Sequence, residues 1–127
     1  ESKNAGFSTG QPWLAVNPNY QAINVQEALA NPDSIFYTYQ KLVQIRKENS
    51  WLIRADFELL DTADKVFAYI RKDGDRRFLV VANLSNEEQD LTVEGNVKSV
   101  LIENTVAQEV FEKQSLAPWD AFCVELL

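Results

Sequence analysis

The sequence predicts a mainly β protein, an antiparallel β-sandwich preceded by a loop and one amphipathic helix. Three observations carry this prediction. Residues 1–24 are rich in Gly, Pro and Asn, and residues 32–49 place apolar side chains at helical spacing. From Leu52 onward, short runs alternate apolar and polar side chains, as strands do. We therefore divide the chain into two parts, residues 1–50 and residues 51–127.

The first 24 residues are predicted to form a loop, because Gly6, Gly10 and Pro12 interrupt any regular pattern. Three aromatic side chains, Phe7, Trp13 and Tyr20, lie within this polar stretch. A long irregular segment of this kind must pack against another surface, and such loops often carry function. The chain begins with Glu rather than Met, so we expect it to be part of a longer protein.

Two helices are predicted next. Asn24 can cap a short helix over Val25–Ala30. The Asn31-Pro32 pair predicts the start of a longer helix that ends near Asn49. Its apolar residues follow helical spacing, and they are Ile35, Phe36, Tyr39, Leu42 and Val43. We expect the face around Phe36, Tyr39 and Val43 to be exposed or to drive self-association.

Only strands are expected after this helix. A hairpin is predicted from Val66–Arg71 and Arg77–Ala82, joined by a turn that contains Asp73-Gly74. Four more strands are expected, at Phe57–Leu60, Asp90–Val93, Ser99–Glu103 and Phe122–Leu126. Because several strands have apolar residues at both odd and even positions, we expect both faces of the sheet to be covered.

The residue content argues against chemistry within this chain. It has no histidine, which excludes Ser-His-Asp triads and ordinary zinc sites. Cys123 is the only cysteine and lies in an apolar run, so we interpret it as a small buried side chain. The net charge of −7 argues against binding to nucleic acid or to anionic membranes. We therefore expect no catalytic residue, no metal and no cofactor here.

Three tryptophans leave two interpretations open. Trp51 follows the long helix and Trp119 precedes the last strand, and both positions suit packing between helix and sheet. The alternative is that Trp13, Trp51 and Trp119 form a platform for stacking sugars, as in a carbohydrate-binding module.

Three segments, taken together, resemble glycoside hydrolase family 13, and within it the oligo-1,6-glucosidase type of α-glucosidase. They are residues 4–13 (NAGFSTGQPW), 16–25 (VNPNYQAINV) and 35–47 (IFYTYQKLVQIRK). The resemblance implies that residues 1–24 are the loop after the eighth strand of a (β/α)8 barrel. It implies that residues 32–49 are the last barrel helix and that residues 52–127 are the C-terminal β-sandwich. The partner of this piece would be the N-terminal barrel of the same enzyme.

The resemblance also implies a function. Residues 118–122 (PWDAF) are most similar to the glucan 1,6-α-glucosidases, which act on isomaltooligosaccharides and dextran with retention. Trehalose-6-phosphate hydrolase and a stand-alone carbohydrate-binding module remain alternatives. The family's catalytic carboxylates match no position of this chain, whereas Lys3, Asn4 and Phe7 would line the rim of the active site. A cytoplasmic location is expected.

Overall fold

The computed structural model describes residues 2–127; Glu1 lies outside the described residues. The chain forms two compact units, Glu1–Gln44 and Ile45–Leu127. Each unit is described below by itself.

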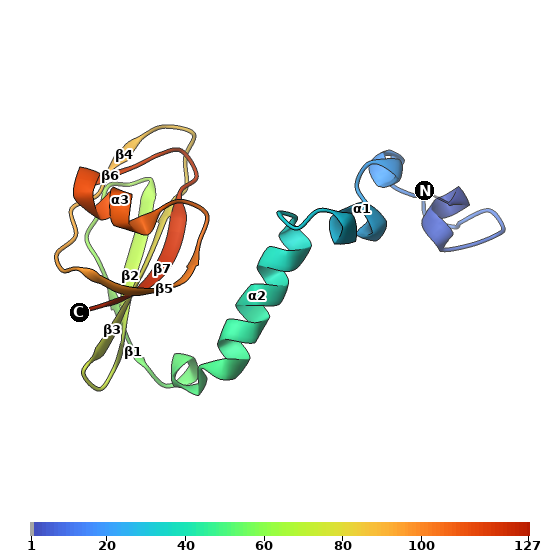
Figure 1. Ribbon diagram of the computed structural model, residues 1–127. Coiled ribbons are helices and arrows are strands. Elements are labelled where there is room, and N and C mark those ends of the chain that lie inside the picture. Colours follow the sequence, from blue (N-terminus) through green and yellow to red (C-terminus); the bar gives the residue numbers. More distant parts are fainter. Residues whose placement is uncertain (1) are drawn as a thin grey trace. The chain divides into compact units, whose positions relative to one another are not determined.

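The first unit consists of short helical segments joined by loops (Figure 1). Two 3-10 turns, η1 (Lys3–Gly6) and η2 (Pro18–Gln21), precede helix α1 (Val25–Ala30). The predicted cap of α1 is confirmed, because Asn24 Oδ1 accepts a hydrogen bond from the Glu27 backbone N–H at 3.0 Å.

The long helix α2 spans Ile35–Glu48, so the predicted start at Pro32 is wrong. The Asn31 side chain accepts the Asp33 N–H at 3.0 Å and closes a turn instead of opening the helix. The first backbone bonds of the helix converge on the Ser34 carbonyl. The predicted exposure of the apolar face is confirmed, since Phe36, Tyr39 and Val43 are exposed.

The second unit begins with a 3-10 turn, η3 (Ser50–Ile53), and is dominated by an antiparallel sheet of order β1-β2-β3-β7-β5. Its strands are β1 (Asp56–Leu59), β2 (Val66–Asp73), β3 (Arg76–Asn83), β5 (Val97–Glu103) and β7 (Ala121–Leu126). The predicted hairpin is β2–β3, with Gly74 at φ +59° in its turn. The mainly β, antiparallel fold class is therefore confirmed.

Two details of the second unit correct the prediction. A helix, α3 (Ala107–Lys113), interrupts the run of strands, and it packs against β5 and β6 (Figure 1). The strand expected over Asp90–Val93 is only the two-residue β4 (Gln89–Asp90), which pairs with β6 (Ser115–Leu116). Beyond Asp90, the Leu91 N–H donates to the Gln114 carbonyl at 3.0 Å, and the Val93 N–H donates to the Gln114 side chain at 3.2 Å.

The core lies on one face of the five-stranded sheet. Alternate residues of the strands fill it, among them Val66, Ala68, Ile70, Leu79, Val81 and Val124. The core is completed by residues outside the five-stranded sheet, which are Leu91, Ala107, Val110 and Leu116. The opposite face is closed only at one end, where Trp51 stacks on Phe78 with ring centroids 3.8 Å apart. The expectation that both faces are covered is therefore wrong for the residues that the structure describes.

Candidate functional site

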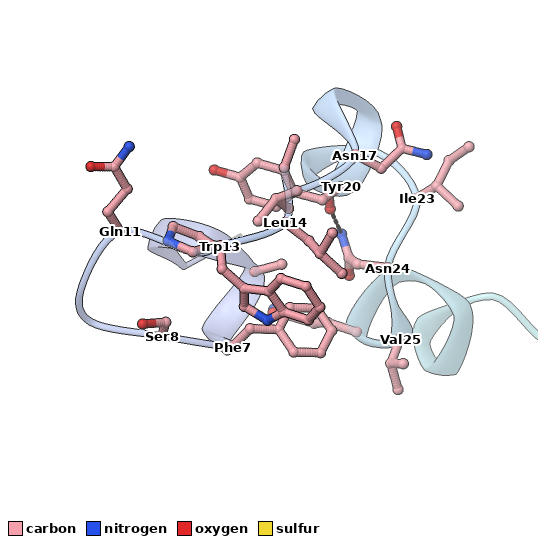
Figure 2. A pocket seen from close by; sticks show the side chains of 15 residues that line it. Phe7, Ser8, Gln11, Trp13, Leu14, Asn17, Tyr20, Ile23, Asn24 and Val25 are labelled. Carbon is pink, nitrogen blue, oxygen red and sulfur yellow. Dashed lines mark hydrogen bonds between the residues drawn. The ribbon is translucent and has the colours of Figure 1, made fainter.

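The first unit contains an open hollow of ≈ 930 Å³, and Figure 2 shows the side chains that line it. Its lining is contributed entirely by residues 5–26. Phe7 and Trp13 belong to it and are 84% and 92% exposed. Exposed aromatic side chains beside a hollow can stack on flat ligand faces, sugar rings included.

A strained turn forms one end of this loop. Asn4, Ala5 and Gly6 all have positive φ, at 56°, 53° and 78°. Glycine adopts such angles readily and asparagine occasionally, so the left-handed Ala5 carries the clearest cost, roughly 1–2 kcal/mol. The surrounding structure must hold them, and the Asn4 side chain does so. Its Nδ2 donates to the Ser8 carbonyl at 2.9 Å and to the Gly10 carbonyl at 2.8 Å.

The opposite wall is closed by Asn24. Its Nδ2 donates to the Tyr20 carbonyl at 3.0 Å, drawn as the dashed line in Figure 2, and to the Gln21 carbonyl at 3.2 Å. The same side chain caps α1, so it ties the end of η2 to the start of α1. Three hydrogen bonds of the Asn24 side chain therefore set this wall, and the sequence predicts only one of them, the cap of α1.

The three predicted rim residues divide into two groups. Phe7 lines the hollow, whereas Lys3 and Asn4 do not. Both amide hydrogens of Asn4 are used within the loop, so only its Oδ1 could accept a bond from a ligand. We therefore interpret Asn4 as the residue that shapes the loop, and Phe7 as the residue that could touch a ligand.

Sequence reasoning expected Tyr20 to pack within this loop but did not count it among the rim residues, and it missed Ile23 altogether. The available signal was the aromatic content of this polar loop, which indicated packing but not the direction of each side chain. No carboxylate, lysine or arginine is among the lining residues. The hollow can thus bind by stacking and contact, and Tyr20 supplies the only phenol among its described lining residues.

The acidic residues that show shifted pKa values lie in the second unit, in ion pairs. Lys72, Lys65 and Lys113 lower the pKa values of Glu58, Glu87 and Glu109 respectively. Within residues 2–127, no three His, Cys, Asp or Glu side chains are close enough together to hold a metal ion. These pairs are typical of a solvated surface and not of a pair of catalytic carboxylates.

The tryptophans do not act as one group. Trp51 packs on the sheet as predicted, but Trp119 is 59% exposed, so its predicted burial between helix and sheet is wrong.

Burial raises the pKa of the Cys123 thiol to about 11, which keeps it protonated at neutral pH and fits its predicted apolar role. Across residues 2–127, the helices are too short or too polar to cross a bilayer.

Two family models match successive parts of the chain. Residues 1–55 match the family model "Alpha amylase, catalytic domain", and residues 57–123 match "Maltogenic Amylase, C-terminal domain". The chain therefore belongs to the α-amylase family of glycoside hydrolases, glycoside hydrolase family 13, as its motifs indicated.

Individual relatives narrow this further. The chain is 94% identical over its whole length to a glucan 1,6-alpha-glucosidase of Streptococcus pneumoniae serotype 4, and 54% identical over 96% of its length to that of Streptococcus dysgalactiae subsp. equisimilis. It is 33% identical over 98% of its length to the trehalose-6-phosphate hydrolase of Bacillus subtilis. The trehalulose synthase MutB of Pseudomonas mesoacidophila superposes on the full chain with a TM-score of 0.86 at 33% identity.

These proteins are much longer than the chain. It spans 24% of the S. pneumoniae enzyme, 23% of the S. dysgalactiae enzyme, and 24% of both the hydrolase and MutB. In such relatives this region is the C-terminal part.

Proposed function

We propose that this chain is the C-terminal part of an α-glucosidase that hydrolyses the α-1,6-glucosidic bonds of isomaltooligosaccharides and dextran with retention. The supporting observation is the 94% identity to a glucan 1,6-alpha-glucosidase across all 127 residues. The 33% identity to a trehalose-6-phosphate hydrolase makes that activity the weaker candidate. The two carboxyl groups of a retaining enzyme, about 5–5.5 Å apart, would lie in the barrel, and the role of this chain would be structural.

Substrate assays test the proposal. The full-length enzyme should release glucose from isomaltose and isomaltotriose in preference to trehalose-6-phosphate, and the 127-residue chain should release none from either. Faster hydrolysis of trehalose-6-phosphate would overturn the substrate assignment. Turnover by the purified 127-residue chain would overturn its structural role.

We propose the division of the chain at residues 1–50 and 51–127 as the end of the barrel and the β-sandwich. The barrel of the same enzyme would be the partner of the apolar face of α2. Without the barrel, that face would drive self-association through Phe36, Tyr39 and Val43. Sedimentation velocity of the chain and of its Tyr39→Glu variant checks this: the variant should be monomeric where the parent associates. A parent chain that stays monomeric at all concentrations would contradict it.

At the active site, Phe7 would form part of the rim, with Lys3 and Asn4 behind it. In the full-length enzyme, Phe7→Ala should raise KM for isomaltotriose more than KM for a one-glucose aryl substrate, because only the longer sugar reaches the rim. Thr9→Ala, in the same loop, is the matched control. Equal effects on both substrates would remove Phe7 from the rim.

A cytoplasmic location is part of this proposal. Measuring how much of the full-length enzyme is found in the exported fraction of a cell culture would test it.

A second candidate rests on the exposure of Trp13 and Trp119, which leaves both indoles available to stack on sugars. Titrating the chain with isomaltooligosaccharides while following tryptophan fluorescence tests it. A saturable change at micromolar sugar would favour a binding module; a flat response would exclude one.

A further inference from the structure

The turn between β6 and β7 (Figure 1) contains a tryptophan in an unfavourable backbone conformation. The Asp120 N–H donates to the Ala117 carbonyl at 3.2 Å, which closes a four-residue turn with Pro118 second and Trp119 third. Trp119 has φ +66°, and a turn with this pattern, type II, favours Gly or Asn in its third position. A bulky side chain is therefore held in the left-handed region against its own preference.

Hydrogen bonds from two other segments fix this turn. The Trp119 N–H donates to the Ser85 carbonyl at 3.2 Å, and the Trp119 carbonyl accepts from Asn104 Nδ2 at 2.9 Å. Asn83, which is buried, donates through Nδ2 to the Ala117 carbonyl at 2.9 Å. Strained backbone conformations persist only where the surrounding structure over-determines them, and they gather at ligand sites.

The indole of Trp119 lacks the contacts that hold Trp51 on the sheet. Trp51 stacks on Phe78, and its Nε1–H donates to Asn49 Oδ1 at 2.9 Å. Within residues 2–127, the ring of Trp119 stacks on no other aromatic ring and its indole N–H has no hydrogen-bond partner. A lone exposed tryptophan is ordinary on a protein surface, but one that is also strained and rigidly held indicates a ligand.

The polar groups beside Trp119 fit a neutral sugar. Asp120 Oδ2 accepts the Ala117 N–H at 2.8 Å, whereas its Oδ1 has no partner among the described residues. Asn104 uses one amide hydrogen on the Trp119 carbonyl and, in the same part of the chain, leaves the other for a ligand. A flat indole face with a donor and an acceptor beside it matches the apolar face and the hydroxyl groups of a glucose ring. The net charge of −7 disfavours anionic ligands.

We propose that Trp119, with Asn104 and Asp120 beside it, is a holding site for α-1,6-linked glucan chains. The inference rests on the proposed function for the identity of the sugar, because a glucan is the substrate proposed for the whole enzyme. Trp119 is not among the residues that line the hollow of the first unit, so this is an additional site. A polymer has many glucose units, so one segment can lie on Trp119 while another is bound elsewhere, which raises the effective concentration of the polymer at the enzyme.

Affinity electrophoresis of the 127-residue chain in gels that contain dextran tests the proposal. The parent should be retarded, and Trp119→Asn should raise the dissociation constant for dextran about tenfold, the effect of losing one stacked ring. Trp119→Tyr keeps a ring and should keep most of the binding. Trp13→Asn, the same change at the exposed indole of the first unit, is the matched control and should bind like the parent. A parent that is not retarded, or equal losses in Trp119→Asn and Trp13→Asn, would overturn the proposal.

Unfolding measurements separate a binding role from a structural one. Because asparagine tolerates the left-handed conformation, Trp119→Asn should lower the urea midpoint far less than Trp51→Asn, the same change at a tryptophan packed on the sheet. Equal lowering by the two would show that the Trp119 indole serves the fold and would overturn the proposal.

The substrate assays are read separately from this binding test. A full-length enzyme that hydrolyses isomaltose, together with a chain that dextran does not retard, would overturn the holding site alone. A full-length enzyme that prefers trehalose-6-phosphate, together with a retardation that Trp119→Asn removes, would overturn only the substrate assignment.

Discussion

Glu125 offers the sharpest test of the electrostatics of the β unit. Its side chain is 8% exposed and accepts two bonds from Arg76, both at 3.1 Å, and one from Lys98 Nζ at 2.9 Å. Hydrogen bonds from Arg76 and then Lys98 lower the pKa of this carboxyl from 4.5 to about 2. At about 1.4 kcal/mol for each pH unit, the upper bound on its contribution is about 3 kcal/mol. Arg76 and Lys98 are about half exposed, so solvent screening reduces this to about 1–2 kcal/mol.

The sign of the pH dependence follows from the lowered pKa. The contribution is fully present above about pH 4.5, the unfolded value, and is lost as pH falls toward about 2. We therefore expect Glu125→Gln to lower the free energy of unfolding by about 1–2 kcal/mol at pH 7 and the difference from the parent to vanish near pH 2. Urea titrations followed by tryptophan fluorescence measure both, with Glu94→Gln, an exposed carboxylate in a turn, as the control. A difference between parent and Glu125→Gln that stays constant from pH 7 to pH 3 would refute the lowered pKa.

Three further substitutions test the packing, each by urea unfolding of the 127-residue chain. Leu116→Ala should cost about 2–5 kcal/mol because the side chain is fully buried, whereas Leu84→Ala, 64% exposed, should cost less than about 0.5 kcal/mol; similar costs would contradict the placement of the core. Asn83→Ala should cost about 2–3 kcal/mol, since its buried amide bonds two backbone carbonyls at 2.8 and 2.9 Å; a neutral result would show that water replaces them. Trp51→Ala should cost about 2 kcal/mol and expose Phe78 to oxidation, and unchanged protection of Phe78 would contradict the stack.

The elements that could be predicted are those whose local sequence pattern agrees with their tertiary contacts. Alternating side chains and an Asp-Gly turn are sufficient to define the β2–β3 hairpin, whose bounds extend the prediction only slightly. Helix α3 was not predicted because it has only seven residues. The apolar spacing from Ala107 to Val110 is too short to distinguish a helix from a strand. The start of α2 was misplaced for a different reason: Asn31 can cap a helix or close a turn, and contacts beyond the sequence window decide between them.

The candidate site was harder to predict, because its geometry depends on positive φ angles, which residues other than glycine rarely adopt. Asn4 and Ala5 carry no side-chain feature that demands positive φ, yet both are left-handed. The hydrogen bonds from Asn4 to Ser8 and Gly10 hold them there. The family motif therefore singled out the loop that lines the hollow. Only the structure shows that Asn4 shapes this loop and that Phe7 lines the hollow.

The two apolar surfaces follow from one physical cause. The face of α2 around Tyr39 and the side chains of Phe57, Leu59 and Phe67 on the sheet are of types that normally stabilise a fold by leaving water, yet they are exposed in this chain. Both are adjacent to the residues matched by the catalytic-domain model, since α2 lies within it and Trp51 joins it to the sheet. Under the proposed function, such surfaces would be the contribution of this chain, which has no histidine, because they would hold a barrel and its eighth loop in place. Under the same proposal, the strained turn at Asn4 and Ala5 would be the point at which this support reaches the active site. Relaxing that turn should change how the enzyme binds long sugars before it changes how fast bonds are broken.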